Sequence, residues 1–227
     1  TLGVLHLSRN NLTERCADAL AVPLRCDNTG LTELHLDRNQ LGNEACCAIA
    51  SALQVNKRLT VLNICHNVIS DEGVAELAAA LHENTALREL RLSSNLVTDA
   101  GALHLAALLR KPHGFYEGGV LVESLHALDL GDNKLLDKAA VAFAEALTTN
   151  KCLRLLSLRS NRITSGTCQL FADALRVNAT LTELDLDLNQ ITMQDALRTF
   201  APVLSGRKDA NTMIEVLQVG ANIAHSC

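Results

Sequence analysis

The feature that most constrains the fold of this chain is a repeated string of leucines that ends at an asparagine. The pattern is LxxLxLxxNxL, and its first copy is carried by Leu2, Leu5, Leu7, Asn10 and Leu12. Eight copies follow one another, the last of them weaker, and all eight have Asn at the same position. They start at residues 2, 31, 59, 87, 125, 153, 181 and 214. A spacing of 28 residues, the commonest interval, predicts one small structural unit per copy, stacked into an elongated array.

The first half of each unit is predicted to be a short strand followed by a turn. The alternating LxL segment places its leucines on one side of an extended chain. The asparagine follows where the chain bends away, and its amide can bond to the backbone of the turn and of the neighbouring unit. Stacked units should therefore form a ladder of asparagines, of which Asn95 is one rung.

The second half of each unit is predicted to be a helix. In the third copy, apolar residues recur at helical spacing between Val74 and Leu81. Ser70 and Asp71 precede them and are expected to cap that helix, as are the acidic residues at similar positions, Asp99, Asp137 and Asp195. A second asparagine stands three residues before the next leucine and is expected to end the helix in the left-handed conformation. It occurs at Asn28, Asn56, Asn84, Asn150, Asn178 and Asn211.

The full unit, LxxLxLxxNxLxxxGxxxLxxALxxNxxL, resembles the ribonuclease-inhibitor-like leucine-rich repeats, which also occur in Ran GTPase-activating proteins, tropomodulin and NOD-like receptors. The resemblance covers essentially the whole chain, interrupted only near residues 111–121 and 205–210. It implies an α/β fold, a right-handed leucine-rich-repeat solenoid or horseshoe, with a parallel β-sheet on the concave face and helices on the convex face. Residues 1–227 are expected to form a single domain of about eight repeats and to be a fragment of a larger protein. Because these families share the repeat and differ in function, the resemblance is specific for the fold alone.

Composition and charge narrow the classes of function. Hydrophobic residues make up 48% of the 227 residues, enough for a substantial core, while aromatic residues at 2% argue against an aromatic-lined ligand pocket. A net charge of -5 argues against a nucleic-acid partner, which would require a basic stripe. The chain has no run of 18 apolar residues, so we expect neither a transmembrane helix nor a membrane partner.

No chemistry-bearing motif is present. The eight cysteines include no CxxC pair, so they are predicted to be reduced thiols in a protein of the cytoplasm or the nucleus, with no structural zinc. The phosphate-loop, dinucleotide, HExxH and GxSxG motifs are all missing, and the sequence therefore predicts no cofactor, no catalytic residue and no enzyme activity. His6 and His35 should be neighbours across two strands, but a metal needs three or four ligands, so paired surface histidines are expected.

The candidate functional surface is the concave side of the predicted sheet, made by the residues that alternate with the leucines. Arginines and histidines predominate in the early repeats and acidic residues in the late ones. Two interpretations remain open: a solvated surface without special meaning, or a polarised face that orients a charged protein partner. The candidate partner-binding residues on this face are His6, Arg9, His35, Arg38, His66, Arg88, Arg91, Asp129, Arg154, Arg159, Glu183, Asp185 and Asp187.

An insertion at residues 111–120 interrupts the repeats and adds two aromatic candidates, Phe115 and Tyr116. Its glycines and proline predict an exposed loop. The two rings either fold back over a helix end or serve as an anchor for a partner, since aromatic residues are enriched at binding hot spots.

The leading functional hypothesis is a non-enzymatic scaffold that binds an unidentified partner protein through the concave face and the 111–120 loop. The alternatives are a GTPase-activating protein resembling those that act on Ran, and the sensor region of a NOD-like receptor. Apolar residues at the outer repeats, such as Leu2 and Leu217, also predict that flanking segments of the parent chain cap both ends.

Overall fold

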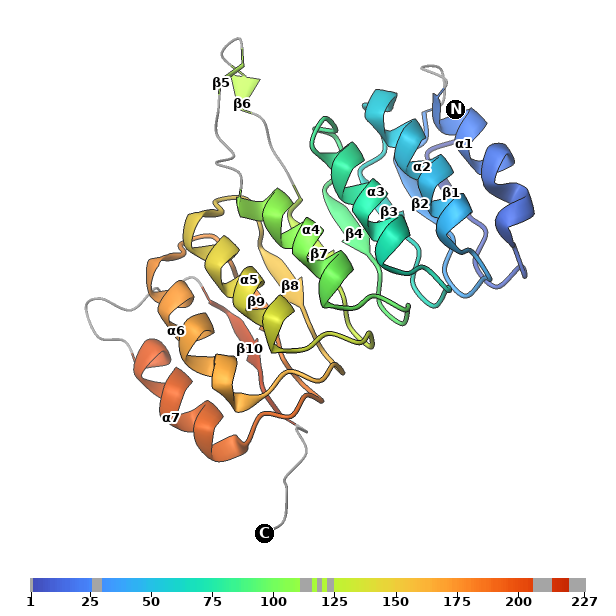
Figure 1. Ribbon diagram of the computed structural model, residues 1–227. Helices are drawn as coiled ribbons and strands as arrows, with labels where there is room; N and C mark the ends of the chain where they lie inside the picture. The colour runs from blue at the N-terminus through green and yellow to red at the C-terminus, as the bar shows by residue number, and fades with distance from the viewer. Residues whose placement is uncertain are drawn as a thin grey trace.

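The computed structural model describes residues 2–25, 30–110, 116–117, 120–121, 125–205 and 214–220. Within these residues, eight strands form one sheet and seven α-helices lie along one side of it (Figure 1). The strands of the sheet are β1 (Val4–His6), β2 (Glu33–His35), β3 (Val61–Asn63), β4 (Glu89–Arg91), β7 (Ala127–Asp129), β8 (Leu155–Ser157), β9 (Glu183–Asp185) and β10 (Val216–Gln218). The helices are α1 (Ala17–Arg25), α2 (Asn43–Val55), α3 (Asp71–Leu81), α4 (Asp99–Arg110), α5 (Asp137–Thr149), α6 (Cys168–Val177) and α7 (Met193–Leu204). Short 3₁₀ turns precede two of them, at Glu14–Cys16 and Ser165–Thr167.

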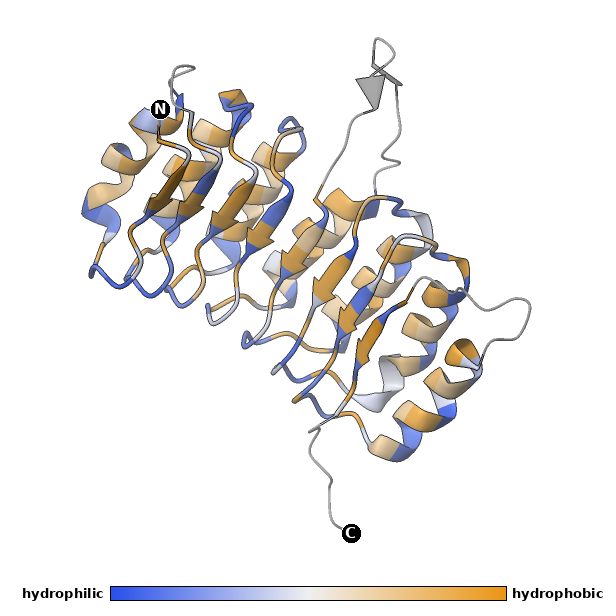
Figure 2. Ribbon diagram, turned by 180° about the vertical axis from the view of Figure 1, so that it is seen from behind, coloured by the Kyte–Doolittle hydropathy of each residue, from blue (hydrophilic) through white to orange (hydrophobic). Residues whose placement is uncertain are grey.

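Every neighbouring pair of strands in the sheet is parallel, and the strand order follows the order of the chain. The central leucine of each strand lies opposite the central leucine of the next, for example Leu34 opposite Leu62 and Leu62 opposite Leu90. Seen from the opposite side, the strands form one face of the array (Figure 2). The predicted α/β solenoid is therefore confirmed, and its repeat places equivalent residues of successive units side by side.

The asparagine ladder is also confirmed. The amide of Asn95 donates to the carbonyl of Leu92 in its own turn and to that of Ile64 in the preceding repeat, both at 3.0 Å. Its oxygen accepts the N–H of Ile69, again from the preceding repeat, at 3.1 Å. The same pattern recurs at the buried rungs Asn67, Asn133, Asn161 and Asn189. Each turn is thus held to its neighbour by one side chain.

The second asparagine does not end its helix in the left-handed conformation, so that prediction is wrong. Asn56, Asn150 and Asn178 have φ of -71°, -66° and -82° with extended ψ. The side chain of Asn178, which is fully buried, instead donates to the carbonyls of Leu147 and Asn150 and accepts the N–H of Leu181. These asparagines form a second ladder that links each helix end to the preceding repeat. Asn28 and Asn211 lie outside the described residues.

The left-handed conformation is found one residue before each described asparagine of the first ladder. The residues concerned have φ between 50° and 59° and are Arg9, Arg38, His66, Ser94, Asp132, Ser160 and Leu188. The turn requires this conformation, because the backbone N–H of each of these residues donates to a carbonyl of the next repeat. The N–H of Arg38, for example, donates to the Cys65 carbonyl at 2.9 Å. This geometry sends a column of exposed or half-exposed side chains away from the edge of the sheet.

The predicted helix caps are wrong in most of the helices for which a cap was expected. Ser70 makes no side-chain bond to its own helix. The acidic residue at a helix start bonds instead to the beginning of the next helix: Asp137 accepts the N–H of Thr164 at 2.7 Å and its hydroxyl at 2.6 Å. Asp99 likewise accepts the N–H of Leu136 at 2.8 Å. The carboxylates therefore link repeats rather than cap their own helices, except that Thr192 caps α7 and bonds to Asp195 of that helix.

In the insertion, two short strands pair antiparallel, β5 (Tyr116–Glu117) with β6 (Val120–Leu121). The position of Phe115 and the side chain of Tyr116 lie outside the described residues. No helix in the described part of the chain is long and apolar enough to cross a membrane.

Candidate protein-binding face

The side chains that point away from the helices form what we call the strand face. Because the strands are parallel and in register, one column of this face runs through equivalent positions about 4.8 Å apart. Pairing places His6 beside His35, then Asn63, Arg91, Asp129, Ser157, Asp185 and Gln218 in turn. The structure therefore brings five of the predicted site residues into a single line across the sheet.

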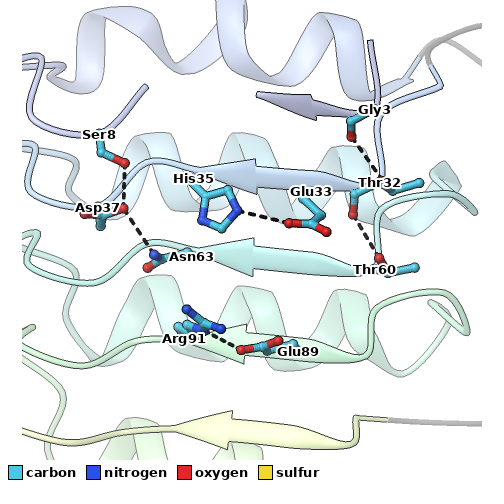
Figure 3. Close-up of polar contacts among 10 residues, drawn as sticks. All are labelled: Gly3, Ser8, Thr32, Glu33, His35, Asp37, Thr60, Asn63, Glu89 and Arg91. Carbon is cyan, nitrogen blue, oxygen red and sulfur yellow. Dashed lines mark hydrogen bonds and ion pairs between the residues drawn. The ribbon is translucent and has the colours of Figure 1, made fainter. Parts of the chain in front are cut away.

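The first part of this column is a pair of stacked histidines. The rings of His6 and His35 lie 4.4 Å apart between centroids and 23° from parallel. His35 Nε2 lies 3.3 Å from the carboxylate of Glu33 (Figure 3). The described residues include no group of three or more His, Cys, Asp or Glu side chains placed to hold a metal ion.

Three basic candidates lie beside these histidines on the left-handed column. Arg9, Arg38 and His66 are exposed, with φ of 59°, 57° and 51°. None of the three forms a side-chain hydrogen bond or ion pair within the described part of the chain. The nearby carboxylate of Asp37 bonds to neutral groups instead. Its Oδ1 accepts the Ser8 hydroxyl at 2.6 Å and the Asn63 amide at 3.1 Å (Figure 3). Positive charge is therefore left available at this end of the face.

The other predicted arginines are less available to bind a partner. Arg91 forms an ion pair with Glu89 on the same strand (Figure 3). Arg88 donates to the carbonyl of Thr85 at 3.0 Å, just before the strand begins. Arg159 Nη1 lies 3.3 Å from Asp187 Oδ2. Arg154 is exposed and, like Arg88, stands at the start of a strand, away from the column.

A hollow of about 610 Å³ opens on the strand face over β4, β7, β8 and β9. Small residues in the middle of it, Ala127, Gly131 and Ser157, leave space between longer side chains on either side. A side chain at Gly131 would narrow the hollow, since its Cβ would stand 3.2 Å from Asp129 Oδ1. Five of the predicted site residues line this hollow: Arg91, Asp129, Arg159, Glu183 and Asp185.

The most buried charged group of the hollow is Asp185, which is 8% exposed. Its Oδ1 accepts the N–H of Asp187 at 3.0 Å, and the Ser157 hydroxyl lies at 3.5 Å from Oδ2. Burial raises the pKa of the Asp185 carboxyl above its ordinary value, and the charge of Asp187 adds to the rise, although Arg159 opposes it. Ionised Asp185 is therefore incompletely neutralised by its surroundings.

The predicted partner-binding residues left out two acidic residues of this site. Glu89 takes up the charge of Arg91, and Asp132 accepts the Ser94 hydroxyl at 2.7 Å on the wall of the hollow. The hollow itself was also missed, although the small residues Ala127, Gly131 and Ser157, at three different strand-face positions of two neighbouring repeats, were visible in the sequence. Phe115 and the Tyr116 side chain cannot be placed relative to this face, because they lie outside the described residues.

The parallel strands, the outer helices and the two asparagine ladders define a repeat solenoid. A family model described as "Leucine Rich repeat" matches residues 27–50, 55–78, 83–106, 123–144 and 177–194. The chain belongs to the leucine-rich-repeat family. No curated protein sequence matches it significantly. Among solved structures it is similar to one titled "Leiomodin-1 Actin-Binding Site 2 (ABS2)", at 17% identity and a TM-score of 0.49, over 83% of this chain and 87% of that one.

Proposed function

We propose that this chain is a non-enzymatic scaffold that binds a partner protein through its strand face and the 111–120 loop. Repeat solenoids use the broad surface of their sheet for such contacts. The observation that supports the proposal is the separation of charge along that face. Free positive charge lies at Arg9 and Arg38, while under-neutralised negative charge lies in the hollow at Asp129 and Asp185.

Separated charge of this kind affects association in two ways. It accelerates the encounter with a complementary surface, and it disfavours the reversed orientation, in which like charges meet. A partner that lays an acidic region over β1–β3 and a basic region over β7–β9 would therefore bind in one direction. The remaining candidates, His6, His35, His66, Arg88, Arg91, Arg154, Arg159, Glu183 and Asp187, surround these two regions.

An intracellular location is part of the same proposal. The described cysteines are all free thiols: Cys16, Cys46, Cys47, Cys65, Cys152 and Cys168. Free thiols are typical of the reducing cytosol or nucleus.

The test is photo-crosslinking from defined positions of the chain inside cells. A crosslinking residue placed at Asn63 or Ser157 reports on the strand face, and one at Glu76, exposed on α3, reports on the helix side. We expect discrete adducts from the strand-face positions, and we expect the R9E/R38E and D129K/D185K variants to lose them. Equal adducts from Glu76, or adducts that survive both charge reversals, would contradict the proposal.

A second measurement separates binding from the GTPase-activating alternative. Single-turnover hydrolysis of GTP by a Ran-type GTPase should proceed at the same rate with and without this chain. Acceleration that depends on the chain would overturn the non-enzymatic assignment.

A further inference from the structure

The hollow over β4, β7, β8 and β9 is negatively charged. Two guanidinium groups line it, those of Arg91 and Arg159. Five carboxylates line it as well, those of Glu89, Asp129, Asp132, Glu183 and Asp185. Both guanidinium groups are already engaged, with Glu89 and with Asp187 respectively.

The carboxylates that remain bond only to neutral donors. Asp129 Oδ1 accepts the N–H of Gly131 at 2.9 Å, and Asp132 Oδ2 accepts the Ser94 hydroxyl. Glu183 has no hydrogen-bond or ion-pair partner among the described residues. Asp185 accepts the Asp187 N–H while lying nine-tenths buried. No cation of the described chain pairs with any of these four within ion-pair distance.

A further unsatisfied atom belongs to Asp187, which is the ion-pair partner of Arg159 and does not itself line the hollow. Asp187 Oδ1 is buried and has no hydrogen-bond partner within the described part of the chain. An unpaired buried carboxylate oxygen costs free energy, as does a buried charge without a counter-ion. A cationic group entering the hollow would reduce the cost of the buried charge of Asp185.

The spacing of the carboxylates indicates which kind of cation fits. Register places Asp129 and Asp185 on either side of Ser157, two strands apart, at about 9.6 Å between backbones. A divalent ion needs several ligand atoms within about 2.6 Å of one point, which this arrangement does not supply. A guanidinium or ammonium group carries several donors on a long stem and can bond to separated carboxylates.

We propose that this hollow, lined by Asp129, Glu183 and Asp185, receives an arginine or lysine side chain from a basic segment of the partner. The inference rests on the proposed function and adds the chemistry of the partner. The small residues Ala127 and Ser157 provide the space for the side chain, which lies over Ser157 between the two aspartates.

The test uses peptides of defined charge. A fluorescein-labelled octapeptide of alternating Gly and Arg is titrated with the protein, and the anisotropy is compared with that of Gly–Ser and Gly–Glu octapeptides. We expect binding of the Gly–Arg peptide alone, weakened by salt. The D129N/D185N variant keeps an oxygen for the Gly131 and Asp187 N–H groups and should bind it at least about tenfold more weakly.

The matched control is E44Q/E76Q, which removes the same number of negative charges from exposed positions on α2 and α3. It should leave the affinity within about twofold of the unmodified protein, because those charges lie on the helix side and are screened. In addition, the backbone amides of Gly131 and Asp187 should shift in NMR spectra as the Gly–Arg peptide is added.

The inference is overturned if the Gly–Arg peptide binds no better than Gly–Ser, or if both double variants weaken it equally. Shifts confined to amides outside the hollow would overturn it as well. Failure here and failure of the proposed function are distinguishable. If strand-face crosslinks persist while the Gly–Arg peptide does not bind, the scaffold function stands and only the chemistry assigned to the hollow is wrong.

Discussion

The carboxylate of Asp71, the first residue of α3, binds the turn that starts the next helix at Thr98. It accepts the Thr98 N–H at 2.7 Å and the Thr98 hydroxyl at 2.6 Å, and it also accepts the N–H of Gly101 at 2.9 Å. Gly101 permits this approach, since a Cβ at that position would stand 2.9 Å from the Asp71 backbone. The contact between the two repeats therefore depends both on the glycine of one repeat and on the aspartate of the preceding repeat.

Asp71→Ala should lower the free energy of unfolding by about 1–3 kcal/mol, because donors at the start of α4 lose their acceptor. Urea denaturation followed by circular dichroism measures the change. Glu44→Ala is the control: Glu44 also lies in the first turn of a helix, is exposed and accepts no side-chain hydrogen bond from a described residue. A loss at Glu44 equal to that at Asp71 would show that only the helix dipole matters.

Asn95→Ala should also cost about 1–3 kcal/mol, because it leaves the buried N–H of Ile69 without its acceptor. It also removes one of the two amide donors to the carbonyls of Ile64 and Leu92, which Asn67 and Asn133 still reach. Asn10→Ala at the first rung is the matched control, since among the described residues the side chain of Asn10 makes only one bond, an exposed one to the Ser8 carbonyl. Thermal melting of both variants decides the matter. An unchanged melting temperature for Asn95→Ala would contradict the structural role of the ladder.

The regular part of this structure could be predicted from sequence because a single period governs it. Leucine spacing fixes which side chains face the helices, and it also fixes register, so that Leu34 lies opposite Leu62 as expected. The columns of the strand face follow from the same register. The charge separation between Arg38 and Asp185 was therefore visible before any coordinates.

The errors arise where one residue type can satisfy two different partners. An aspartate at a helix start can cap its own helix or the next one, and only the stacking distance between repeats decides, as Asp137 and Thr164 show. An asparagine near a helix end can adopt positive φ or can bond across repeats, and Asn178 does the latter because it is buried against Leu147. The sequence likewise shows which charged residues line the hollow, but it does not show which of them form ion pairs.

The thiols should react according to burial. Cys46 and Cys168 are each 1% exposed, and burial raises the pKa of both thiols, that of Cys168 to about 11. Since the thiolate is the reactive form, neither should be labelled by a disulfide reagent at pH 8 until the protein unfolds. The half-buried thiols Cys16, Cys47 and Cys152 should react before these two.

Mass spectrometry of the labelled peptides measures these rates. In denaturant without reductant, all eight cysteines of the chain should be labelled. A reproducible count of six or fewer would show that disulfides are present in the native protein.

Asp185→Asn should stabilise the protein at neutral pH more than at acidic pH. Burial raises the pKa of the Asp185 carboxyl above its ordinary 3.8, so the folded state holds the proton more tightly than the unfolded state. Ionisation therefore destabilises the folded protein progressively as the pH rises from 3.8 through the raised pKa, and the cost is complete above it. The asparagine avoids this cost while its oxygen still accepts the Asp187 N–H.

Urea unfolding of the variant and the unmodified protein at pH 3 and pH 7 tests this expectation. The stability gained by Asp185→Asn should be greater at pH 7. Asp132→Asn, at an exposed position on the same hollow, corrects for the general relief of repulsion between acidic residues. If both variants gain the same stability at pH 7, burial of Asp185 is not the cause. If Asp185→Asn gains more, the hollow contains a buried negative charge that a basic partner can neutralise.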